Sequence, residues 1–435
     1  MSAQVSGRGG ELVEGGRAIG VGPRWLAHLW SGGVDKVLDR IDRGLERGSI
    51  LATLPSGETR MLGGRRGGFD AVVTIRSWRA LLRLATAGSV GWYQAWEMGE
   101  WDSPDPVPLF ALFMDNATAL GETARARGPW RLASRLIHWL NRNTRTGALR
   151  NIHVHYDIGN DFYEQWLGET MVYSSGIFAR PADRPNAFSQ FATELDVAQS
   201  NKIGAIVDRL HVAQGDNVLE IGCGWGTLAA FLASSKGAQV DAISLSDEQL
   251  AYARGRWATE RGSADFRKQD YRDVGLGGEG GRYDAVVSVE MVEAVGRQFW
   301  PDFLDCIARN LKPGGRAAIQ YIAMRDEIFD GYARSADFIQ TFIFPGGMLV
   351  RESEFRRLAE ERGLSWEDSE HFGLDYARTL REWRSNFDAA AQEGRLPAGF
   401  DQRFVRLWRF YLMYCEGGFR GGGIDVAQVT LVKQG

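Results

Sequence analysis

The feature that constrains this chain most is a regular alternation of helical and extended patterns between residues 187 and 325. A Gly-rich turn at 222–226 joins a short apolar run to a helical stretch, and further apolar runs follow with helices or turns between them. Strands joined through helices pair in parallel, and helices must then cover both faces of the sheet. The sequence therefore predicts an α/β fold with a doubly wound sheet. Its expected strands are 217–222, 239–245, 264–270, 283–290 and 316–323, and its expected helices include 187–210, 246–262 and 299–311.

The regions before this sheet differ from it in composition. Residues 1–21 are Gly-rich and unpatterned, which indicates disorder. Residues 22–115 combine helical stretches with an alternating strand pair across a turn at Pro55, and predict a small α+β domain. A linker (116–150) and the α/β domain with appended helices and strands (151–435) complete the expected organisation.

The linker carries a strong positive charge. It holds seven arginines from Arg125 through Arg150, and no acidic residue occurs from Thr123 through Tyr156. After Pro129 the arginines follow helical spacing beside an apolar stripe, which predicts a basic amphipathic helix. Such a helix attracts anionic lipid headgroups, at about 1 kcal/mol per basic residue. A helix packed on the next domain with a solvated basic face is equally compatible with this pattern.

Composition limits the class of protein and its location. The 435 residues carry 51 Lys plus Arg against 55 Asp plus Glu, a net charge of −4, and 44% of them are hydrophobic, as in an ordinary globular protein. No apolar run approaches the ~18 residues that span a bilayer, and the N-terminus lacks a secretory pattern. We therefore expect a cytoplasmic protein whose contact with the inner membrane face is peripheral. The slightly acidic charge and the lack of a base-reading motif argue against nucleic acid as a partner.

Cysteine and histidine spacing gives no sign of a disulfide or a metal site. Cys223, Cys306 and Cys415 lie far apart without CxxC spacing, so neither a disulfide framework nor structural zinc is expected. His153 and His155 lack carboxylates at convergent spacing. We expect reduced thiols and no metal.

The Gly-rich turn is the first candidate binding site. Gly222, Gly224 and Gly226 follow the first apolar strand in GxGxG spacing, and Glu220 precedes them at the strand end. A carboxylate there suits the cationic amino acid part of a ligand better than a pyrophosphate, although nicotinamide and flavin folds use similar turns. Together with residues 269–273 and 283–296, the turn resembles that of a class I S-adenosylmethionine methyltransferase, and a nucleotide-dependent oxidoreductase is the alternative.

That resemblance implies a Rossmann-like, seven-stranded sheet with S-adenosylmethionine as cofactor. Many such folds end the second strand with an acidic residue that holds the ribose, but Ser244 stands near that place, so Ser244, Ser246 or Gln249 would supply neutral contacts. The expected cofactor-binding residues are Tyr173, Ser174, Glu220, Gly222, Gly224, Gly226, Ser244, Leu245, Gln249, Asp270 and Tyr271.

Further segments give a closer resemblance. Residues 155–178, the glycine turn, and residues 244–249, 269–273, 290–296, 342–347, 372–383 and 411–420 are similar to segments of the cyclopropane fatty acid synthase family, in that family's order. The similarity runs from about residue 150 to the C-terminus. Residues 22–115 are similar in outline to the N-terminal domain of the longer bacterial members, which helps dimerisation and membrane use.

The resemblance implies methyl transfer to a cis double bond in an acyl chain of a membrane phospholipid, with the phospholipid surface as partner and a homodimer as a further expectation. An alkene is a poor nucleophile, so it must be held against the sulfonium methyl at ~3–3.5 Å in a dry site. The product is a carbocation, which aromatic faces stabilise without trapping it covalently. The aromatic residues expected to do so are Tyr173, Phe178, Phe344 and Tyr376.

The same resemblance implies a bound bicarbonate as the final base. Its expected holders are Glu293 and Tyr376, with Ser175 at a position where the family has cysteine and Gln320 at a position where it has histidine. A glutamine amide can donate a hydrogen bond to an oxyanion but cannot titrate, so a proton relay through Gln320 is lost. Glu290, three residues before Glu293, is expected to be structural.

Cys415 completes the candidate catalytic residues. It stands where the family has a cysteine once regarded as a nucleophile. Methyl transfer needs no covalent enzyme intermediate, so a packing role is favoured for Cys415.

The identity of the product is left open by these observations. Loss of a proton from the added methyl group closes a cyclopropane ring, which we favour slightly, whereas loss from a neighbouring chain carbon gives a methyl-branched or methylene chain. Two rival hypotheses are a methyltransferase for a small isoprenoid or sterol and a lipid-binding protein without catalytic activity.

Overall fold

The computed structural model describes residues 8–14, 31–121, 158–178, 193–258, 264–278, 280–334 and 336–435. The arginine-rich part of the expected linker helix, most of the expected N-terminal disorder, and His153, His155 and Asp157 lie outside these residues. The chain forms two compact units. Unit 1 comprises Met1–Arg142, Arg325–Gly346 and Ala398–Ile424, and unit 2 comprises Asn143–Met324, Gly347–Pro397 and Asp425–Gly435.

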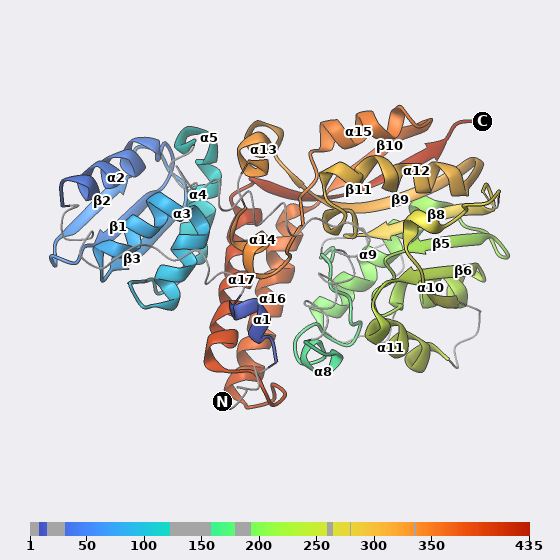
Figure 1. Cartoon of the computed structure of the whole chain (residues 1–435), viewed down its shortest axis with the longest axis horizontal. Helices are drawn as coiled ribbons and strands as arrows, with labels where there is room; N and C mark the ends of the chain where they lie inside the picture. Colours follow the sequence, from blue (N-terminus) through green and yellow to red (C-terminus); the bar gives the residue numbers. More distant parts are fainter. Residues whose placement is uncertain are drawn as a thin grey trace, which may run out of the picture. The chain divides into compact units, whose positions relative to one another are not determined.

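Unit 1 is built on a four-stranded sheet of order β2-β1-β3-β4 (Figure 1). The first two strands, β1 (Ser49–Thr53) and β2 (Thr59–Gly63), are antiparallel, as a strand pair across the turn at Pro55 predicts. The other strands are β3 (Asp70–Ile75) and β4 (Trp101–Asp102). The helices of unit 1 are α1 (Gly10–Glu14), α2 (Ser31–Gly44), α3 (Trp78–Glu97), α4 (Val107–Asp115), α5 (Ala117–Leu120), α13 (Asp326–Ala333), α14 (Phe338–Phe342) and α17 (Gln402–Arg420).

The units do not follow the expected linear boundary near residue 150, because helix α17 packs on α4. At Gly417 of α17 a Cβ atom would lie 2.4 Å from the Cβ of Phe110, so only glycine permits this close approach. Phe410 of α17 is in ring contact with Tyr93 of α3. A helix that lies late in the sequence is therefore part of the core of unit 1.

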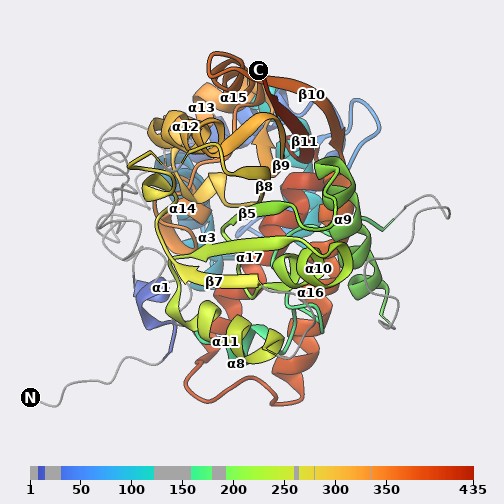
Figure 2. The same ribbon diagram turned by 90° about the vertical axis from the view of Figure 1, so that its right-hand side faces the viewer.

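Unit 2 contains the expected doubly wound sheet, and its seven strands have the order β10-β11-β9-β8-β5-β6-β7 (Figure 2). β5 pairs in parallel with β6 and β8, and β10 pairs antiparallel with β11. The strands are β5 (Asn217–Ile221), β6 (Gln239–Ser244), β7 (Ala264–Lys268), β8 (Tyr283–Val289), β9 (Leu311–Met324), β10 (Leu364–His371) and β11 (Ile424–Lys433). The α/β fold predicted from the alternation is confirmed.

The helices of unit 2 pack on both the central and the edge strands of this sheet. Helix α9 contacts β8 and β9, and α10 and α11 contact β6 and β7. The helices are α8 (Asn160–Tyr163), α9 (Glu194–Leu210), α10 (Thr227–Lys236), α11 (Asp247–Trp257), α12 (Trp300–Asn310), α15 (Glu352–Glu360) and α16 (Gly373–Gln392), with short 3-10 turns η2 (Tyr271–Asp273), η3 (Val292–Ala294) and η4 (Arg297–Phe299). No helix in the described part of the chain has the length and apolar character needed to cross a membrane.

The strand order reverses at β5, which pairs with the following strand β6 on one side and with the later strand β8 on the other. Connections leave in opposite directions at such a point, so a crevice opens at the carboxyl ends of the strands, where open α/β sheets bind ligands. The ligand site of unit 2 is therefore expected beyond Ile221, Ser244 and Val289.

Candidate active site

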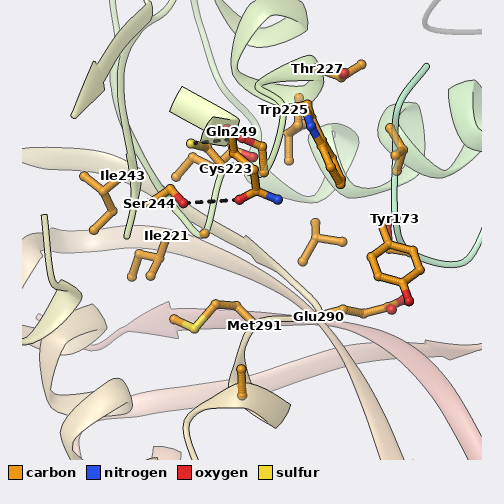
Figure 3. Close-up of a pocket in the computed structure, with 18 of the residues that line it drawn as sticks. Tyr173, Ile221, Cys223, Trp225, Thr227, Ile243, Ser244, Gln249, Glu290 and Met291 are labelled. Atoms are coloured by element: carbon orange, nitrogen blue, oxygen red, sulfur yellow. Dashed lines mark hydrogen bonds between the residues drawn. The ribbon is translucent and has the colours of Figure 1, made fainter. Parts of the chain in front are cut away.

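A cavity of about 220 Å³ lies at this reversal point (Figure 3). A single water needs only about 10–15 Å³ by the same measure, so the cavity has room for a larger ligand. Of the expected cofactor residues it is lined by Tyr173, Ser174, Glu220, Gly222, Gly224, Ser244, Leu245, Gln249 and Tyr271. Residues not expected from the sequence also line it, among them Met171, Lys202, Trp225, Thr227, Gln269, Arg272, Glu290 and Met291.

The three glycines of the turn have different roles. Gly222 and Gly224 line the cavity with φ of 85° and 53°, in the left-handed region that favours glycine. A Cβ at Gly224 would meet no atom of the described chain within 4 Å, so the backbone there is open to a ligand. Gly226 does not line the cavity, and a Cβ there would lie 2.7 Å from the Cε1 of Phe266. Gly226 therefore allows α10 to pack, whereas Gly222 and Gly224 face the ligand site.

Glu220 presents an unsatisfied carboxylate oxygen in the cavity wall. It is buried, and its Oε2 has no hydrogen-bond partner among the described residues. Burial raises the pKa of Glu220 to about 8, and the nearby Lys202 ammonium acts in the opposite sense. A buried carboxyl group with an unpaired oxygen is costly, and the ammonium of a bound amino acid moiety would both satisfy that oxygen and favour the ionised form of Glu220. This observation fits S-adenosylmethionine.

Lys202 is the second buried charge of the cavity. Its Nζ donates to Ser174 Oγ at 2.7 Å, and burial lowers the pKa of Lys202 to about 8. A cation beside Glu220 matches the carboxylate of an amino acid ligand. Sequence reasoning missed Lys202, because it lies in the middle of α9, far along the chain from the glycine turn.

Neutral side chains stand at the end of β6, as the sequence predicts. Ser244 Oγ lies 3.4 Å from Gln249 Oε1, and Ser244 Oγ accepts from the Ser246 backbone N–H at 3.2 Å (Figure 3). Farther along, the Asp270 carboxylate does not line the cavity; the Arg272 guanidinium binds it at 2.6 and 2.8 Å. Gln269 and Arg272, rather than Asp270, face the site in this segment.

Helix α9 holds the segment that closes one side of the cavity. Gln199 Nε2 donates to the Ser174 carbonyl at 2.7 Å, and Asn201 Nδ2 to the Ile177 carbonyl at 3.0 Å. At Gly176 a Cβ would lie 2.8 Å from that of Ala198, so the segment lies directly on the helix.

Aromatic rings surround Tyr173 of this segment. The ring of Tyr173 lies 5.4–5.6 Å from those of Tyr163, Trp166 and Trp383, and Trp383 in turn lies 6.2 Å from Tyr376. Among the aromatic residues expected near the reacting chain, Phe178 stacks under Arg378, and Phe344 is in unit 1, where it contacts Tyr411. The rings of Tyr163, Trp166, Tyr173, Trp383 and Tyr376 therefore form one contiguous group, here called the aromatic wall, and Tyr173 is its member that lines the cavity.

Glu290, whose side chain is partly buried, is the centre of a hydrogen-bond network. Its carboxylate accepts from Tyr376 OH at 2.6 Å, Gln320 Nε2 at 2.7 Å and the Ser175 backbone N–H at 3.0 Å. The three residues expected to surround a bicarbonate together with Glu293 therefore all bind Glu290. The expected pairing of Tyr376 with Glu293 is not the one that the structure shows.

The orientation of the two glutamine amides in this network is fixed by Arg209, which donates at one end, and by the Glu290 carboxylate, which accepts at the other. Arg209 Nε donates to Gln428 Oε1 at 3.3 Å, Gln428 Nε2 donates to Gln320 Oε1 at 3.0 Å, and Gln320 Nε2 donates to Glu290. A guanidinium can only donate, so each amide in turn must present its NH₂ group toward the next acceptor. Gln320 is thereby held as a donor to the Glu290 carboxylate.

Glu290 also has an unusual backbone. Its φ is 48°, in the left-handed region where non-glycine residues are rare, and its N–H donates to the Gln320 carbonyl at 2.8 Å. Such strain costs of order 1–3 kcal/mol and concentrates at functional sites. Burial raises the pKa of Glu290, opposed by the hydrogen bonds from Tyr376, Ser175 and Gln320. Glu290, expected from the sequence to be structural, thus receives the hydrogen bonds of the three residues that were expected around Glu293.

Glu293 lies outside the cavity lining. Its Oε1 accepts from the Ile322 backbone N–H, and its Oε2 has no partner among the described residues. Burial, followed by the charge of Glu290, raises the pKa of Glu293 to about 8. Glu293 is therefore mainly neutral near pH 7, and it secures the start of the 3-10 turn η3 against β9.

Cys415 lies on α17 of unit 1 and does not line the cavity. Burial raises the pKa of its thiol far above the usual range. A thiol that stays protonated is a poor nucleophile, which supports the packing role. The described residues contain no cluster of His, Cys, Asp and Glu that could hold a metal ion.

Comparison with known proteins agrees with this site. The sequence profile of the mycolic acid cyclopropane synthetase family matches residues 143–429. The chain belongs to this family. Its members are S-adenosylmethionine-dependent methyltransferases that act on lipids, and the chain is an enzyme of that class.

Individual relatives cover different parts of the chain. Tuberculostearic acid methyltransferase UfaA1 of Mycobacterium tuberculosis is 36% identical over 371 residues, which is 81% of this chain and 81% of the relative. Cyclopropane-fatty-acyl-phospholipid synthase of Escherichia coli is 33% identical over 279 residues, 64% of this chain and 66% of the relative. The solved mycolic acid cyclopropane synthase CmaA1, complexed with SAH and CTAB, has a TM-score of 0.58 at 26% identity and covers 66% of this chain and 98% of its own.

Proposed function

We propose that this enzyme transfers the methyl group of S-adenosylmethionine to a cis double bond in an unsaturated acyl chain of a phospholipid, and that its product is an open methylene chain rather than a cyclopropane. The observation that carries the proposal is the pair of carboxylates at the cavity. Glu220, with its unpaired oxygen, suits the amino group of the methyl donor, and the partly buried Glu290 lines the same cavity as Tyr173. In Figure 3 the Glu290 side chain extends toward the Tyr173 end of the cavity, away from Ser244 and Gln249.

The residues present fit the donor. S-adenosylmethionine supplies an electrophilic methyl group when it is bound. Glu220 and Lys202 would hold its amino acid part, Gly222 and Gly224 bring backbone close to it, and the Ser244–Gln249 end offers neutral contacts for a ribose. The aromatic wall at Tyr173 excludes water from the opposite side and presents ring faces to a developing cation.

The chemistry needs no reductant if the product stays unsaturated. The π electrons of the alkene form a bond to the methyl carbon, the carbon–sulfur bond breaks, and a cation remains on the neighbouring chain carbon. Loss of a proton from a chain carbon beside the cation gives an internal double bond. A methylene group forms when the hydrogen of the methyl-bearing carbon first moves, as a hydride, to the cationic carbon and a proton is then lost from the methyl group. A saturated methyl branch would require a separate hydride donor, so a reductase would have to act afterwards.

Two findings favour the open chain over the ring. The relative that matches 81% of this chain is named a tuberculostearic acid methyltransferase and not a cyclopropane synthase, and Gln320 replaces the titratable histidine expected from the family. Ring closure remains the second candidate, because Cyclopropane-fatty-acyl-phospholipid synthase is also a relative.

Product analysis distinguishes the two candidates. The purified enzyme is incubated with methyl-labelled S-adenosylmethionine and vesicles of dioleoyl phosphatidylglycerol, and the labelled acyl chains are ozonised and examined by mass spectrometry. A methylene chain is cleaved by ozone, whereas a cyclopropane is not. We expect cleavage at the labelled carbon, and an ozone-resistant product would establish the ring instead.

Contact with the membrane surface, where the phospholipid substrate lies, is part of the same proposal. We propose that the arginine-rich segment from Arg125 to Arg150 brings the enzyme to anionic lipid, which its sequence supports through charge alone. Co-sedimentation with anionic but not with neutral vesicles is expected. Transfer to a free isoprenoid without any vesicle binding would favour a small-molecule methyltransferase.

A further inference from the structure

The expected bicarbonate does not fit the site. A bound anion would need the Tyr376 hydroxyl, the Gln320 amide and the Ser175 N–H, and all three already donate to Glu290. Glu293, the remaining expected holder, directs Oε1 to the Ile322 N–H and does not line the cavity. The donors that would bind a free oxyanion are therefore used by a side chain of the protein itself.

We propose that the Glu290 carboxylate takes the place of the free bicarbonate and is the base that removes the proton from the alkylated acyl chain. This inference rests on the proposed function. Glu290 is suited to the task because it lines the cavity and because its three donors hold the carboxylate in one orientation. Its left-handed backbone conformation is a second, independent sign of function.

The proposed step is balanced within the site. A hydride first moves from the methyl-bearing carbon to the neighbouring cationic carbon, which places the positive charge beside the new methyl group. A carbon–hydrogen bond of that methyl group then breaks, its electron pair forms the new double bond, and the proton binds to a Glu290 oxygen. The carboxylate becomes a carboxylic acid and returns its proton to solvent after the product leaves. No small molecule other than the methyl donor and the lipid takes part.

The electrostatics of the site agree with this role. The Arg209–Gln428–Gln320 chain ends on Glu290 with donors only, so it stabilises the ionised form before reaction. Lys202 adds a positive charge that also favours ionised Glu290, while burial raises the pKa of Glu290 above that of an exposed glutamate. The donors thus favour the ionised form of Glu290, while burial makes its carboxylate more basic than one in water.

The test compares the wild type, Glu290→Gln and Glu290→Gly in buffers that are free of carbon dioxide or supplemented with bicarbonate. Label transfer to dioleoyl phosphatidylglycerol vesicles and S-adenosylmethionine binding are both measured. The matched control is Glu352→Gln, because the Glu352 carboxylate also accepts from a buried tyrosine, Tyr321 OH at 2.8 Å, but lies outside the cavity lining.

We expect wild-type transfer to be independent of bicarbonate. Glu290→Gln should lose about 10²- to 10⁴-fold in rate, the usual contribution of a general base, with unchanged binding of S-adenosylmethionine. Glu290→Gly vacates the anion position and relieves the positive φ, so added bicarbonate or formate should restore part of its activity. The Glu352→Gln control should keep the wild-type rate.

Three results would overturn the proposal: a wild-type enzyme that stops without bicarbonate and recovers with it, a Glu290→Gln variant as fast as the control, or a Glu290→Gly variant that no small anion restores. A separate readout covers failure of the proposed function. If the wild type labels no unsaturated lipid, binding of ¹³C-bicarbonate followed by NMR decides whether Glu290 fills the anion position. Binding to Glu290→Gly alone supports that placement, and equal binding to the wild type contradicts it.

Discussion

The two ends of the cavity in unit 2 differ in how they are built. The donor end is built mainly on one continuous segment, β5 with its glycine turn, and is completed by Lys202 of α9 and by residues that follow β6 and β7. The base end collects Ser175, Glu290, Gln320, Tyr376 and Gln428 from five separate segments. The donor end is shaped mainly by the backbone of the glycine turn, whereas the base end is held together by hydrogen bonds between side chains. The comparison shows why enzymes of one fold can share a methyl donor and differ in the last proton transfer.

Substitution in the glycine turn is expected to have the largest effect on stability at the donor end. Gly226→Ala places a Cβ 2.7 Å from Phe266 at a φ of 85°, so we expect a loss of about 2–4 kcal/mol in the free energy of unfolding, measured by urea denaturation. Gly224→Ala meets no atom of the described chain within 4 Å and should cost only about 1–2 kcal/mol, while it weakens S-adenosylmethionine binding. Equal destabilisation by both would show that the two glycines do not divide packing from binding.

Glu220→Gln tests the charge at the donor end. Removal of the carboxylate leaves the ligand amino group without its ionic partner, so the Kd for S-adenosylmethionine should rise about 10- to 150-fold, corresponding to about 1.5–3 kcal/mol. Isothermal titration calorimetry measures the change. The control is Asp284→Asn, since Asp284 lies near the amino end of β8, outside the cavity lining, where it accepts from Asn217 N–H and Lys312. An unchanged Kd in Glu220→Gln would place the amino group elsewhere.

Tyr376→Phe tests the base end through its pH dependence. A base works when ionised, so transfer should rise with pH through the pKa of Glu290, which burial raises. The Tyr376 hydroxyl lowers that pKa, and its removal should move the rising limb to higher pH and reduce the rate about tenfold at neutral pH. The pH–rate profile of kcat is the measurement. A lower rate with an unshifted limb would indicate that Tyr376 only packs against Trp383.

Glu293→Gln should have the smallest effect. Since the pKa of Glu293 is about 8, the residue is mainly neutral below that pH, and glutamine can still accept the Ile322 N–H. We expect less than about a fivefold change in kcat at pH 7, equivalent to about 1 kcal/mol. The raised pKa also means that the contribution of Glu293 to stability is fully present below its ordinary pKa of 4.5 and is lost progressively as the pH rises from there to about 8. The variant should therefore lose less stability than the wild type over this pH range, and a large loss of turnover would instead support the pairing expected from the sequence.

The sequence predicted the donor end because its determinants are local. Strand β5, the glycine spacing and Glu220 are adjacent in the chain, and their order reveals both the sheet and the ligand type. Asp270 was the exception, because its side chain turns to Arg272, two residues away, rather than to the cavity.

The base end could not be predicted in the same way. Glu290 and Glu293 are three residues apart, and only the folded positions of Gln320 and Tyr376 show which carboxylate receives their hydrogen bonds. One sequence signal did favour Glu290: it directly follows the central strand β8, and the residues after such strands lie at the crevice where ligands bind. The composition of unit 1 was likewise hidden, because the contact of Gly417 with Phe110 joins segments about 300 residues apart.

Strand β11 makes the last segment of the chain part of the proton-transfer apparatus. It lies between β9 and β10, and it carries Gln428, the link between Arg209 and Gln320. The crevice at β5 is flanked by β6 and β8 and has no hydrogen-bonded contact with β11. Damage confined to β11 therefore separates two properties of the enzyme: the pocket for the methyl donor keeps its strands, while the amide that orients the proton acceptor is lost.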